Sequence, residues 1–392
     1  AFRMKTDSEK KLTRNSGFYE RTSKLTRNFV DARGFWLPND YTKHGVINEY
    51  TACREKAVVI DLSSLRKFEI LGPDAEELMN YTLTRNVKKL SVGQVVYSSM
   101  CYENGFMFDD GTLLKLSDHG FRWVCGDEYA GEWLKEQAKK RNYKVLIKNS
   151  TDQINNLSLQ GPNSRKILEK FIFTPPTQPT ISELQWFRFT ICRVDDLNGI
   201  PLIVSRTGYT GELGYEIWCH PSDASKVWDK VMEAGKDEGI IPAGFGALDL
   251  LRIEAGLILF GNEFDGQVDP FEAGVGFTVP LKTKTDDFIG KKNLIKRKEN
   301  PQKKLVGLEL TGKEKANHGD CVHIGRSQVG VITSGCISPT LNKNIALCRI
   351  DIGHSELETE VEVGKIDGHQ KRIPAKIVPF PHYDPTKSRV RS

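Results

Sequence analysis

The sequence of 392 residues lacks the signatures of several large protein classes. It contains no GxGxxG, GxxxxGK[ST] or GxSxG pattern, so nothing indicates a Rossmann fold, a P-loop or the nucleophile elbow of a hydrolase. No apolar run reaches the roughly 18 residues that a membrane-spanning helix needs. Histidines are few and isolated, and we expect no role for them in catalysis.

Cysteine pairs are also missing. The eight cysteines form no CxxC pair and no Cys/His cluster with zinc spacing. A chain of this length does not need a disulfide framework, so we expect reduced thiols, no metal site, and a cytoplasmic location or, in a eukaryote, the mitochondrial matrix. The basic stretch 1–18 has no apolar segment, and we do not expect it to be a secretory signal.

Excess charge is small. The 56 Lys and Arg residues nearly balance the 51 Asp and Glu residues, for a net charge of +5, which argues against nucleic-acid binding. The one dense basic cluster, KKNLIKRK at 291–298, is typical of a solvated helix face. The alternative is a docking surface for an acidic partner or an anionic ligand tail.

Helices and strands are mixed along the chain, which predicts an α+β fold. Apolar runs at 58–62 and 68–71 predict strands, and 75–83 has helical spacing. The same order of strand, turn and helix recurs from 157 to 171. Residues 221–234 predict an amphipathic helix, and we expect a second, apolar helix over 248–259 that is closed by Gly261.

A polar boundary near 298–304 divides the chain. Beyond it, short strands separated by glycine turns predict a small all-β barrel or jelly roll. We therefore expect a region 1–300 made of two interleaved α+β domains, and a β-barrel domain over 301–392.

Three segments contain acids in apolar surroundings. The pair Asp109–Asp110 interrupts ENGFMFDDGTLLKL, where a carboxylate could bind a cationic or NH-bearing ligand; alternatively the pair occupies a hairpin turn. In SRTGYTGELGYEI (205–217), Glu212 and Glu216 lie among glycines and aromatics. A carboxylate there can accept two parallel N–H bonds from an amino-pyrimidine ring, or it can be a solvated acid of a tight hairpin.

The third segment is PAGFGALDLLRIEAGLILFGNEFD, residues 242–265. Asp249, Arg252 and Glu254 interrupt an apolar helical pattern, and Gly246 permits close approach of the backbone to a ligand or another element. The alternative interpretation is a buried helix with one satisfied ion pair.

Nine segments in this order resemble the folate-binding aminomethyltransferase family, which includes the glycine-cleavage T-protein. The resemblance runs from about residue 19 to 383. The segments are VIDLSSLRKFEILGPDAEELMNYTLTRNV, VGQVVYSSM, NGFMFDDG, LQGPNS, SRTGYTGELGYEI, PAGFGALDLLRIEAGLILFGNEFD, DDFIGKKNL, LVGLEL and GVITSGCISPTL.

The resemblance implies a three-domain cloverleaf around a channel for tetrahydrofolate. It implies that Asp109 is the key carboxylate near the reacting folate nitrogens and that Glu216 binds the amino-pyrimidine edge of the pterin. Tyr97 matches an aromatic position near the ligand, and Tyr383 matches, more loosely, a C-terminal tyrosine of the same channel.

The implied activity is transfer of a one-carbon unit from a small amine or aminomethyl donor to tetrahydrofolate, with a lipoyl carrier protein as partner in the glycine-cleavage reaction. Related enzymes demethylate other N-methyl or S-methyl compounds, such as the sulfonium dimethylsulfoniopropionate. The intact Asp109–Asp110 pair favours an amine donor. A non-catalytic folate-binding protein and an interaction module built on the basic cluster remain as alternatives.

Two positions depart from the family pattern. Leu248 stands where the family has an arginine that contacts folate in the glycine-cleavage enzymes, and Arg252 lies one helical turn away. Val124-Cys125-Gly126 stands where the family tends to have Val-Asn. Both departures suggest that folate binding is kept while the donor has changed.

Overall fold

The computed structural model describes residues 14–366 and 370–392, which form two compact units interleaved in sequence. Unit 1 contains residues up to Lys67, Asn149–Asp249 and Arg389–Ser392. Unit 2 contains Phe68–Lys148 and Leu250–Ser388. The stretch 1–13, where we expected no secretory signal, lies outside the described residues.

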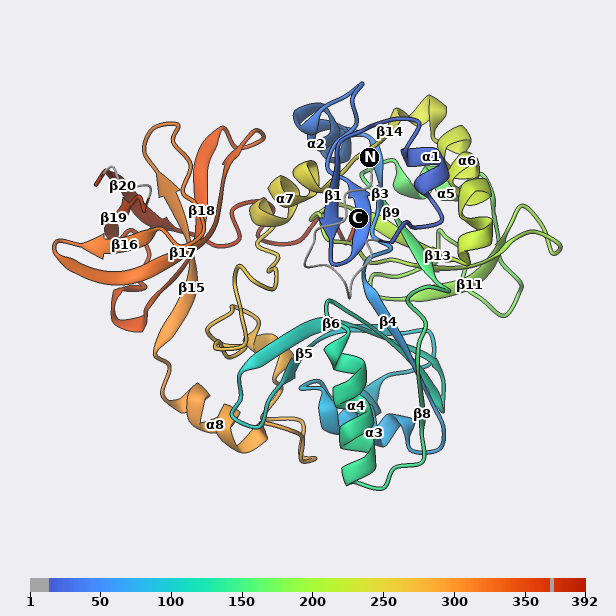
Figure 1. The fold of residues 1–392 in the computed structure, drawn as a ribbon, viewed down its shortest axis with the longest axis horizontal. Coiled ribbons are helices and arrows are strands. Elements are labelled where there is room, and N and C mark those ends of the chain that lie inside the picture. Colours follow the sequence, from blue (N-terminus) through green and yellow to red (C-terminus); the bar gives the residue numbers. More distant parts are fainter. Residues whose placement is uncertain (1–13, 367–369) are drawn as a thin grey trace, which may run out of the picture. The chain divides into compact units, whose positions relative to one another are not determined.

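Unit 1 is built on a seven-stranded sheet with the strand order β10-β11-β12-β13-β9-β3-β14 (Figure 1). Its strands are β3 (Ala57–Asp61), β9 (Asn155–Gln160), β10 (Ile172–Phe173), β11 (Phe189–Val194), β12 (Pro201–Ser205), β13 (Gly214–Cys219) and β14 (Ile240–Pro242). A small sheet of β1 (Phe29–Ala32) and β2 (Phe35–Pro38) and the helices α1 (Tyr19–Thr22), α2 (Val46–Glu55), α5 (Ser164–Glu169) and α6 (Ala224–Ala234) complete the unit.

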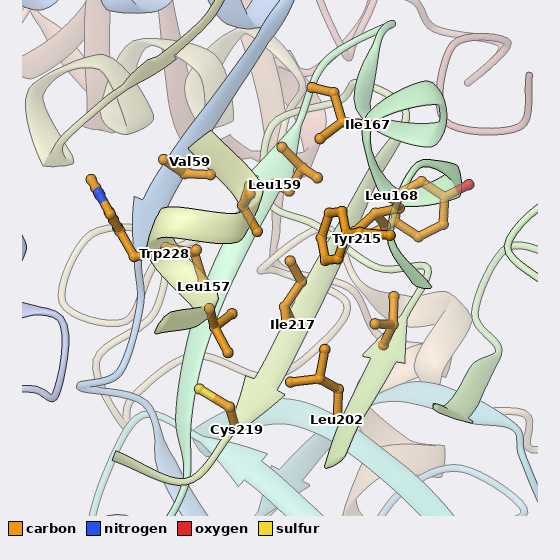
Figure 2. Close-up of a cluster of buried hydrophobic side chains, with 14 of the residues drawn as sticks. Val59, Leu157, Leu159, Ile167, Leu168, Leu202, Tyr215, Ile217, Cys219 and Trp228 are labelled. Atoms are coloured by element: carbon orange, nitrogen blue, oxygen red, sulfur yellow. The ribbon is translucent and has the colours of Figure 1, made fainter. Parts of the chain in front are cut away.

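One face of this sheet forms the hydrophobic core of unit 1. Successive side chains of a strand point to opposite faces, so Leu157 and Leu159 of β9 lie beside Tyr215 and Ile217 of β13 (Figure 2). Helices α5 and α6 cover this face, and α6 contributes Trp228. The apolar positions predicted for both helices are confirmed.

The other face of the same strands is polar although it is buried. On β9 the alternate residues are Asn156, Ser158 and Gln160, all almost fully shielded from solvent. In the antiparallel register Ser158 is paired with Glu216, which is in turn paired with Ser205 of β12. Burying polar groups is costly unless they are hydrogen-bonded, so this polar face is a candidate for function.

Unit 2 contains a five-stranded sheet with the order β5-β6-β7-β4-β8. Its strands are β4 (Arg66–Leu71), which starts at the end of unit 1, β5 (Val95–Cys101), β6 (Met107–Ser117), β7 (Gly120–Cys125) and β8 (Leu146–Asn149). Leu78 and Met79 of helix α3 (Ala75–Thr82) and Trp133 of helix α4 (Tyr129–Lys140) pack into the core of this sheet. Helix α8 (Lys291–Glu299) also belongs to unit 2.

The C-terminal part of unit 2 is a closed barrel, shown in orange and red in Figure 1. Strand β15 pairs with both β18 and β20, which closes the ring without an open edge. The strands are β15 (Lys303–Leu310), β16 (Cys321–Ile324), β17 (Ser327–Ser338), β18 (Lys343–Asp351), β19 (Glu360–Gly364) and β20 (Arg372–Val378). The predicted α+β class with a C-terminal barrel is confirmed.

The helix expected over 248–259 is placed differently. Helix α7 is Phe245–Glu254, so it begins earlier and ends five residues sooner. Gly256 has φ +71°, and the Leu257 amide donates to the Arg252 carbonyl, as in a glycine-terminated helix end. The prediction that Gly261 closes this helix is therefore wrong.

The glycines at 208 and 214 make room for one side chain. A Cβ atom on Gly214 would lie 2.0 Å from Gln160 Oε1, and a Cβ atom on Gly208 would lie 2.2 Å from it. The Gln160 amide donates to the carbonyls of Thr207 and Tyr215 and accepts from the Thr210 hydroxyl, so it cannot move without losing these bonds. It holds the 206–213 loop against the polar face.

We expect Gly214→Ala to lower the free energy of unfolding by about 1–3 kcal/mol, because the new methyl group displaces the Gln160 amide. Gly353→Ala is the matched control, since its Cβ atom would enter open space and its backbone has no positive φ. Urea denaturation measures both variants. Equal stability of the two variants would contradict the proposed role of Gln160.

Candidate active site

Glu216 lies at the centre of the polar face, on strand β13. Its Oε1 accepts a hydrogen bond from the Thr207 hydroxyl at 2.8 Å, and its Oε2 accepts one from Asn156 Nδ2 at 3.3 Å. The side chain is partly exposed, whereas its neighbours on the same face are buried. The carboxylate is therefore held in place and keeps an accessible surface.

A directed chain of hydrogen bonds ends at this carboxylate. Trp218 Nε1, which can only donate, donates to Ser205 Oγ at 3.0 Å. Ser205 Oγ lies 2.8 Å from Thr207 Oγ1. Because the Thr207 proton goes to Glu216, Ser205 donates to Thr207, and the whole chain is oriented to support a negatively charged carboxylate.

Burial raises the pKa of Glu216 above that of an ordinary glutamate. The bonds from Thr207 and Asn156 oppose this shift, as does the positive charge of Lys67. Lys67 is itself fully buried, and its Nζ donates to the Ser63 carbonyl at 2.9 Å. Burial likewise raises the pKa of Asp61, and the positive charge of Lys67 opposes that rise, so one internal cation lies near two carboxylates.

Glu212, the other acid of the glycine-rich segment, has a structural role. Its carboxylate accepts from Arg54 Nη1 at 3.1 Å and from Arg389 Nε at 2.5 Å. Arg389 also donates to the Arg54 carbonyl, so the segment Arg389–Ser392 is attached to unit 1. The alternative interpretation, a tight hairpin, is right only in that β12 and β13 form an antiparallel pair. Neither Glu212 nor Glu216 occupies a tight two-residue turn.

Asp109 and Asp110 lie inside strand β6, so the hairpin-turn interpretation of this pair is wrong. As neighbours in a strand they point to opposite faces. Asp109 shares its face with Met100 and Leu113, which belong to the hydrophobic core below α3 and α4. Asp110 shares the other face with Tyr97.

The two carboxylates have different environments. Asp109 is 1 % exposed, and it accepts from the backbone amides of Asp110, Gly126 and Asp127 at 2.9, 3.2 and 3.2 Å. These bonds join β6 to the end of β7. Asp110 is partly exposed, and its Oδ2 accepts from the Tyr97 hydroxyl at 2.6 Å. Asp109 thus anchors the strand, and Asp110 presents a carboxylate.

Two further residues surround Tyr97, and sequence reasoning missed both. The Phe277 ring lies 6.1 Å from the Tyr97 ring and is 62 % exposed. Arg85 Nε donates to the Tyr97 carbonyl at 2.8 Å, and its guanidinium lies 5.3 Å from the Phe277 ring centroid. An exposed aromatic beside an arginine is suited to a flat ligand with a negatively charged end. Phe277 is the middle residue of a short 3-10 helix, Gly276–Thr278, and three residues are too few for a periodic pattern to predict it.

Tyr383 lies beyond the last barrel strand, in the same unit as Tyr97 and Asp109. Its backbone amide donates to the Glu254 carbonyl at 2.9 Å, which attaches this segment to the end of α7. Glu216 belongs to the other unit. The four predicted site residues are thus divided between the units, three in unit 2 and one in unit 1.

Two charged residues of α7, Arg252 and Glu254, bind other parts of the protein and so stabilise the fold. Arg252 and Glu263 form a buried ion pair at 2.9 Å, and Arg252 also donates to Ser334 Oγ of the barrel. Glu254 accepts from the Ser338 hydroxyl. This supports the interpretation of a buried helix with one ion pair. Leu248 is buried, and Arg252 is too engaged to replace the family arginine.

The basic cluster forms helix α8, in which Lys292, Lys296 and Lys298 are exposed and Leu294 is buried, as expected for a solvated helix face. Within residues 14–366 and 370–392, no group of three or more His, Cys, Asp or Glu side chains is arranged to hold a metal ion. Across the same residues, every helix is too short or too polar to cross a bilayer.

Two family models match the chain. The GCVT N-terminal domain matches residues 18–283, and the glycine cleavage T-protein C-terminal barrel domain matches residues 303–384. The crystal structure of the glycine cleavage system aminomethyltransferase T from Bartonella henselae aligns over 94 % of this chain and 98 % of its own, with a TM-score of 0.83 and 25 % identity.

Curated relatives fall into two groups. A trimethylamine-oxide aldolase from Ruegeria pomeroyi is 57 % identical over 392 residues, which is 100 % of this chain and 50 % of that protein. The chain thus spans half the length of this relative. An aminomethyltransferase from Symbiobacterium thermophilum is 39 % identical over 373 residues, covering 93 % of this chain and 96 % of that protein.

Proposed function

Because the chain belongs to the glycine cleavage T-protein family of aminomethyltransferases, we propose that it transfers a one-carbon unit from a small amine or aminomethyl donor to tetrahydrofolate. The observation that carries this proposal is the buried polar face with Glu216 at its centre. Its carboxylate is oriented by Thr207 and Asn156 and keeps an accessible surface.

This arrangement fits the pterin ring of tetrahydrofolate. The amino-pyrimidine edge presents parallel N–H donors, and an ionised carboxylate accepts two of them side by side. Lys67 and the chain from Trp218 stabilise the ionised form within a buried surrounding. The proposal therefore gives Glu216 the role of binding and orienting the pterin.

In unit 2 we propose Asp110, rather than the Asp109 expected from sequence, as the carboxylate that contacts the reacting groups. Asp109 is directed toward the core side of β6 and holds three backbone amides, whereas Asp110 is partly exposed and bonded to Tyr97. Asp109 retains a positioning role because its Oδ1 accepts from the Asp110 amide.

Tetrahydrofolate, when bound, supplies the secondary amines that accept the one-carbon unit. As the new C–N bond to a folate amine forms, the bond from the one-carbon group to the donor nitrogen breaks. The folate N–H proton can pass through a carboxylate to the departing donor amine, and the same carboxylate stabilises the positive charge that develops before this transfer. The bond from the Tyr97 hydroxyl holds Asp110 for this role. Phe277 and Tyr383 are proposed to contact the flat part of the ligand.

The experiment that tests the proposal is calorimetry with tetrahydrofolate. We expect Glu216→Gln to weaken binding about 10- to 100-fold, because the amide turns a donor toward ligand N–H groups. The exposed Glu360→Gln is the control.

The pH dependence of binding is a second test. Because burial raises the pKa of Glu216, the affinity of the wild type for tetrahydrofolate should fall at a higher pH than that at which an ordinary glutamate protonates. Absence of binding by the wild type would remove the proposal.

The acid pair is tested by single turnover. We expect Asp110→Asn to lower the rate well over tenfold while changing tetrahydrofolate affinity less, since its charge acts mainly in the transition state. Asp109→Asn should chiefly lower the melting temperature, because an amide nitrogen would face backbone amides. The reverse pattern would restore Asp109 as the reacting acid, and folate binding without turnover of any donor would indicate a non-catalytic protein.

A second candidate concerns the donor. Leu248 replaces the arginine expected from the family, and the Ruegeria relative, named as an aldolase of an amine oxide, is more similar to this chain than the Symbiobacterium aminomethyltransferase. These observations favour a methylated amine or amine oxide as the source of the one-carbon unit, in place of an aminomethyl group on a lipoyl carrier protein.

A donor panel separates the two candidates. With tetrahydrofolate present, we expect conversion of trimethylamine oxide or another methylated amine, or of formaldehyde released from the amine oxide, and little release of ammonia from an aminomethyl-lipoyl carrier. Leu248 is buried, so an arginine at this position has to direct its guanidinium to solvent for the protein to fold. The melting temperature of Leu248→Arg is therefore measured before its activity. Efficient use of the lipoyl carrier by the wild type would contradict the second candidate.

A further inference from the structure

Asn156 contains a polar atom that no described residue satisfies. Its side chain is fully buried on the polar face, at 0 % exposure. The amide nitrogen donates to Glu216 Oε2 at 3.3 Å, but Oδ1 has no hydrogen-bond partner within residues 14–366 and 370–392. A buried carbonyl oxygen without a partner destabilises a fold, so its presence here calls for an explanation.

The orientation of this amide follows from its neighbour. Exchanging oxygen and nitrogen would bring Oδ1 against the Glu216 carboxylate, where two acceptors would repel each other. The nitrogen therefore faces Glu216, and the oxygen is the group left over. The backbone of Asn156 is satisfied separately, since its amide donates to Ser63 Oγ and its carbonyl accepts from Leu62.

Strand geometry places the unpartnered oxygen beside the candidate pterin position. Glu216 is paired across the strands with Ser158, and Asn156 is two residues farther along β9, on the same face. Asn156 and Glu216 are therefore neighbours on this face and are joined by the bond from Nδ2 to Oε2. Together they hold three acceptor oxygens, of which Asn156 Oδ1 has no hydrogen-bond partner among the described residues.

We propose that Asn156 Oδ1 accepts the second hydrogen of the ligand's 2-amino group, which makes Asn156 a specificity-determining residue for rings with an unsubstituted amino-pyrimidine edge. The inference rests on the proposed function, because it assumes that Glu216 binds such a ring. The carboxylate takes the ring N–H and one hydrogen of the exocyclic amine, and Asn156 takes the other. A pyrimidine without that amine, or with a methyl group on it, leaves the oxygen without a partner.

The test is a binding cycle between a protein change and a ligand change. Calorimetry compares tetrahydrofolate with its analogue carrying one methyl group on the 2-amino nitrogen, on the wild type and on Asn156→Leu, which keeps the size but removes the acceptor. We expect the wild type to lose about tenfold or more in affinity on methylation, and the variant to bind tetrahydrofolate about tenfold more weakly with little further loss on methylation. If the leucine variant does not fold, Asn156→Ser replaces it, because the serine side chain is too short to reach the ligand. Its affinities for tetrahydrofolate and for the methylated analogue should likewise differ little.

The control is Asn344→Leu on barrel strand β18. Asn344 is also buried, and its Oδ1 likewise has no partner in the described part of the chain, but its nitrogen donates to the carbonyls of Gly312 and Glu314 rather than to a site carboxylate. We expect its affinity ratio to equal that of the wild type. If the Asn156 variants weaken both ligands by the same factor, Asn156 only holds Glu216 and the inference is overturned. If the wild type does not bind tetrahydrofolate, the proposed function itself fails.

Discussion

The alternation of side chains along strands β9 and β13 is the constraint on which the candidate site depends. One set of positions fills the core under α5 and α6, and the other set, one residue out of phase, carries Asn156, Ser158, Gln160 and Glu216. A slip of one residue in register would exchange the two sets and destroy both the core and the site. The packing of the hydrophobic face thus determines the position of Glu216, and the polar face remains available because the other face stabilises the unit.

The same alternation gives the two acids of unit 2 different environments. Successive residues of a strand point to opposite faces, so Asp109 points toward the core and Asp110 points away from it. The buried carboxylate is tolerated because three backbone amides bind it, and those amides belong to the segment that follows β7. A buried, hydrogen-bonded charge therefore fixes the strand from which a more accessible charge is presented. The two carboxylates need not contact each other for this, because Asp109 and Asp110 are adjacent residues of the same strand.

The sequence predicted much of the fold because long periodic patterns are reliable. It located the strands around 57–71 and 155–160, the helices α3, α5 and α6, and the barrel. It misplaced the end of α7 because the apolar pattern continues past Gly256, where the backbone turns. The site was predicted less well. Residue types alone did not separate Glu212 from Glu216, since the partners of Glu212 are Arg54 and Arg389, distant in sequence. Phe277 lies in a 3-10 helix of three residues, Gly276–Thr278, which is too short for a periodic pattern. The proposal of Asp110 in place of Asp109 rests on the register of β6.

The hydrogen-bonded groups around Glu216 and the apolar Leu248 differ in how easily each can be replaced. The groups that support Glu216 are buried and mutually dependent, so replacing any one of them leaves another polar group unsatisfied, and such networks resist change. Leu248, by contrast, is a buried apolar side chain on a helix, where exchange with a long charged residue alters recognition without dismantling a hydrogen-bond network. Selection for a new one-carbon donor would therefore act on positions of the second kind. The buried polar face and the apolar Leu248 of α7 together support the proposal of a folate enzyme whose one-carbon donor differs from that of the aminomethyltransferases.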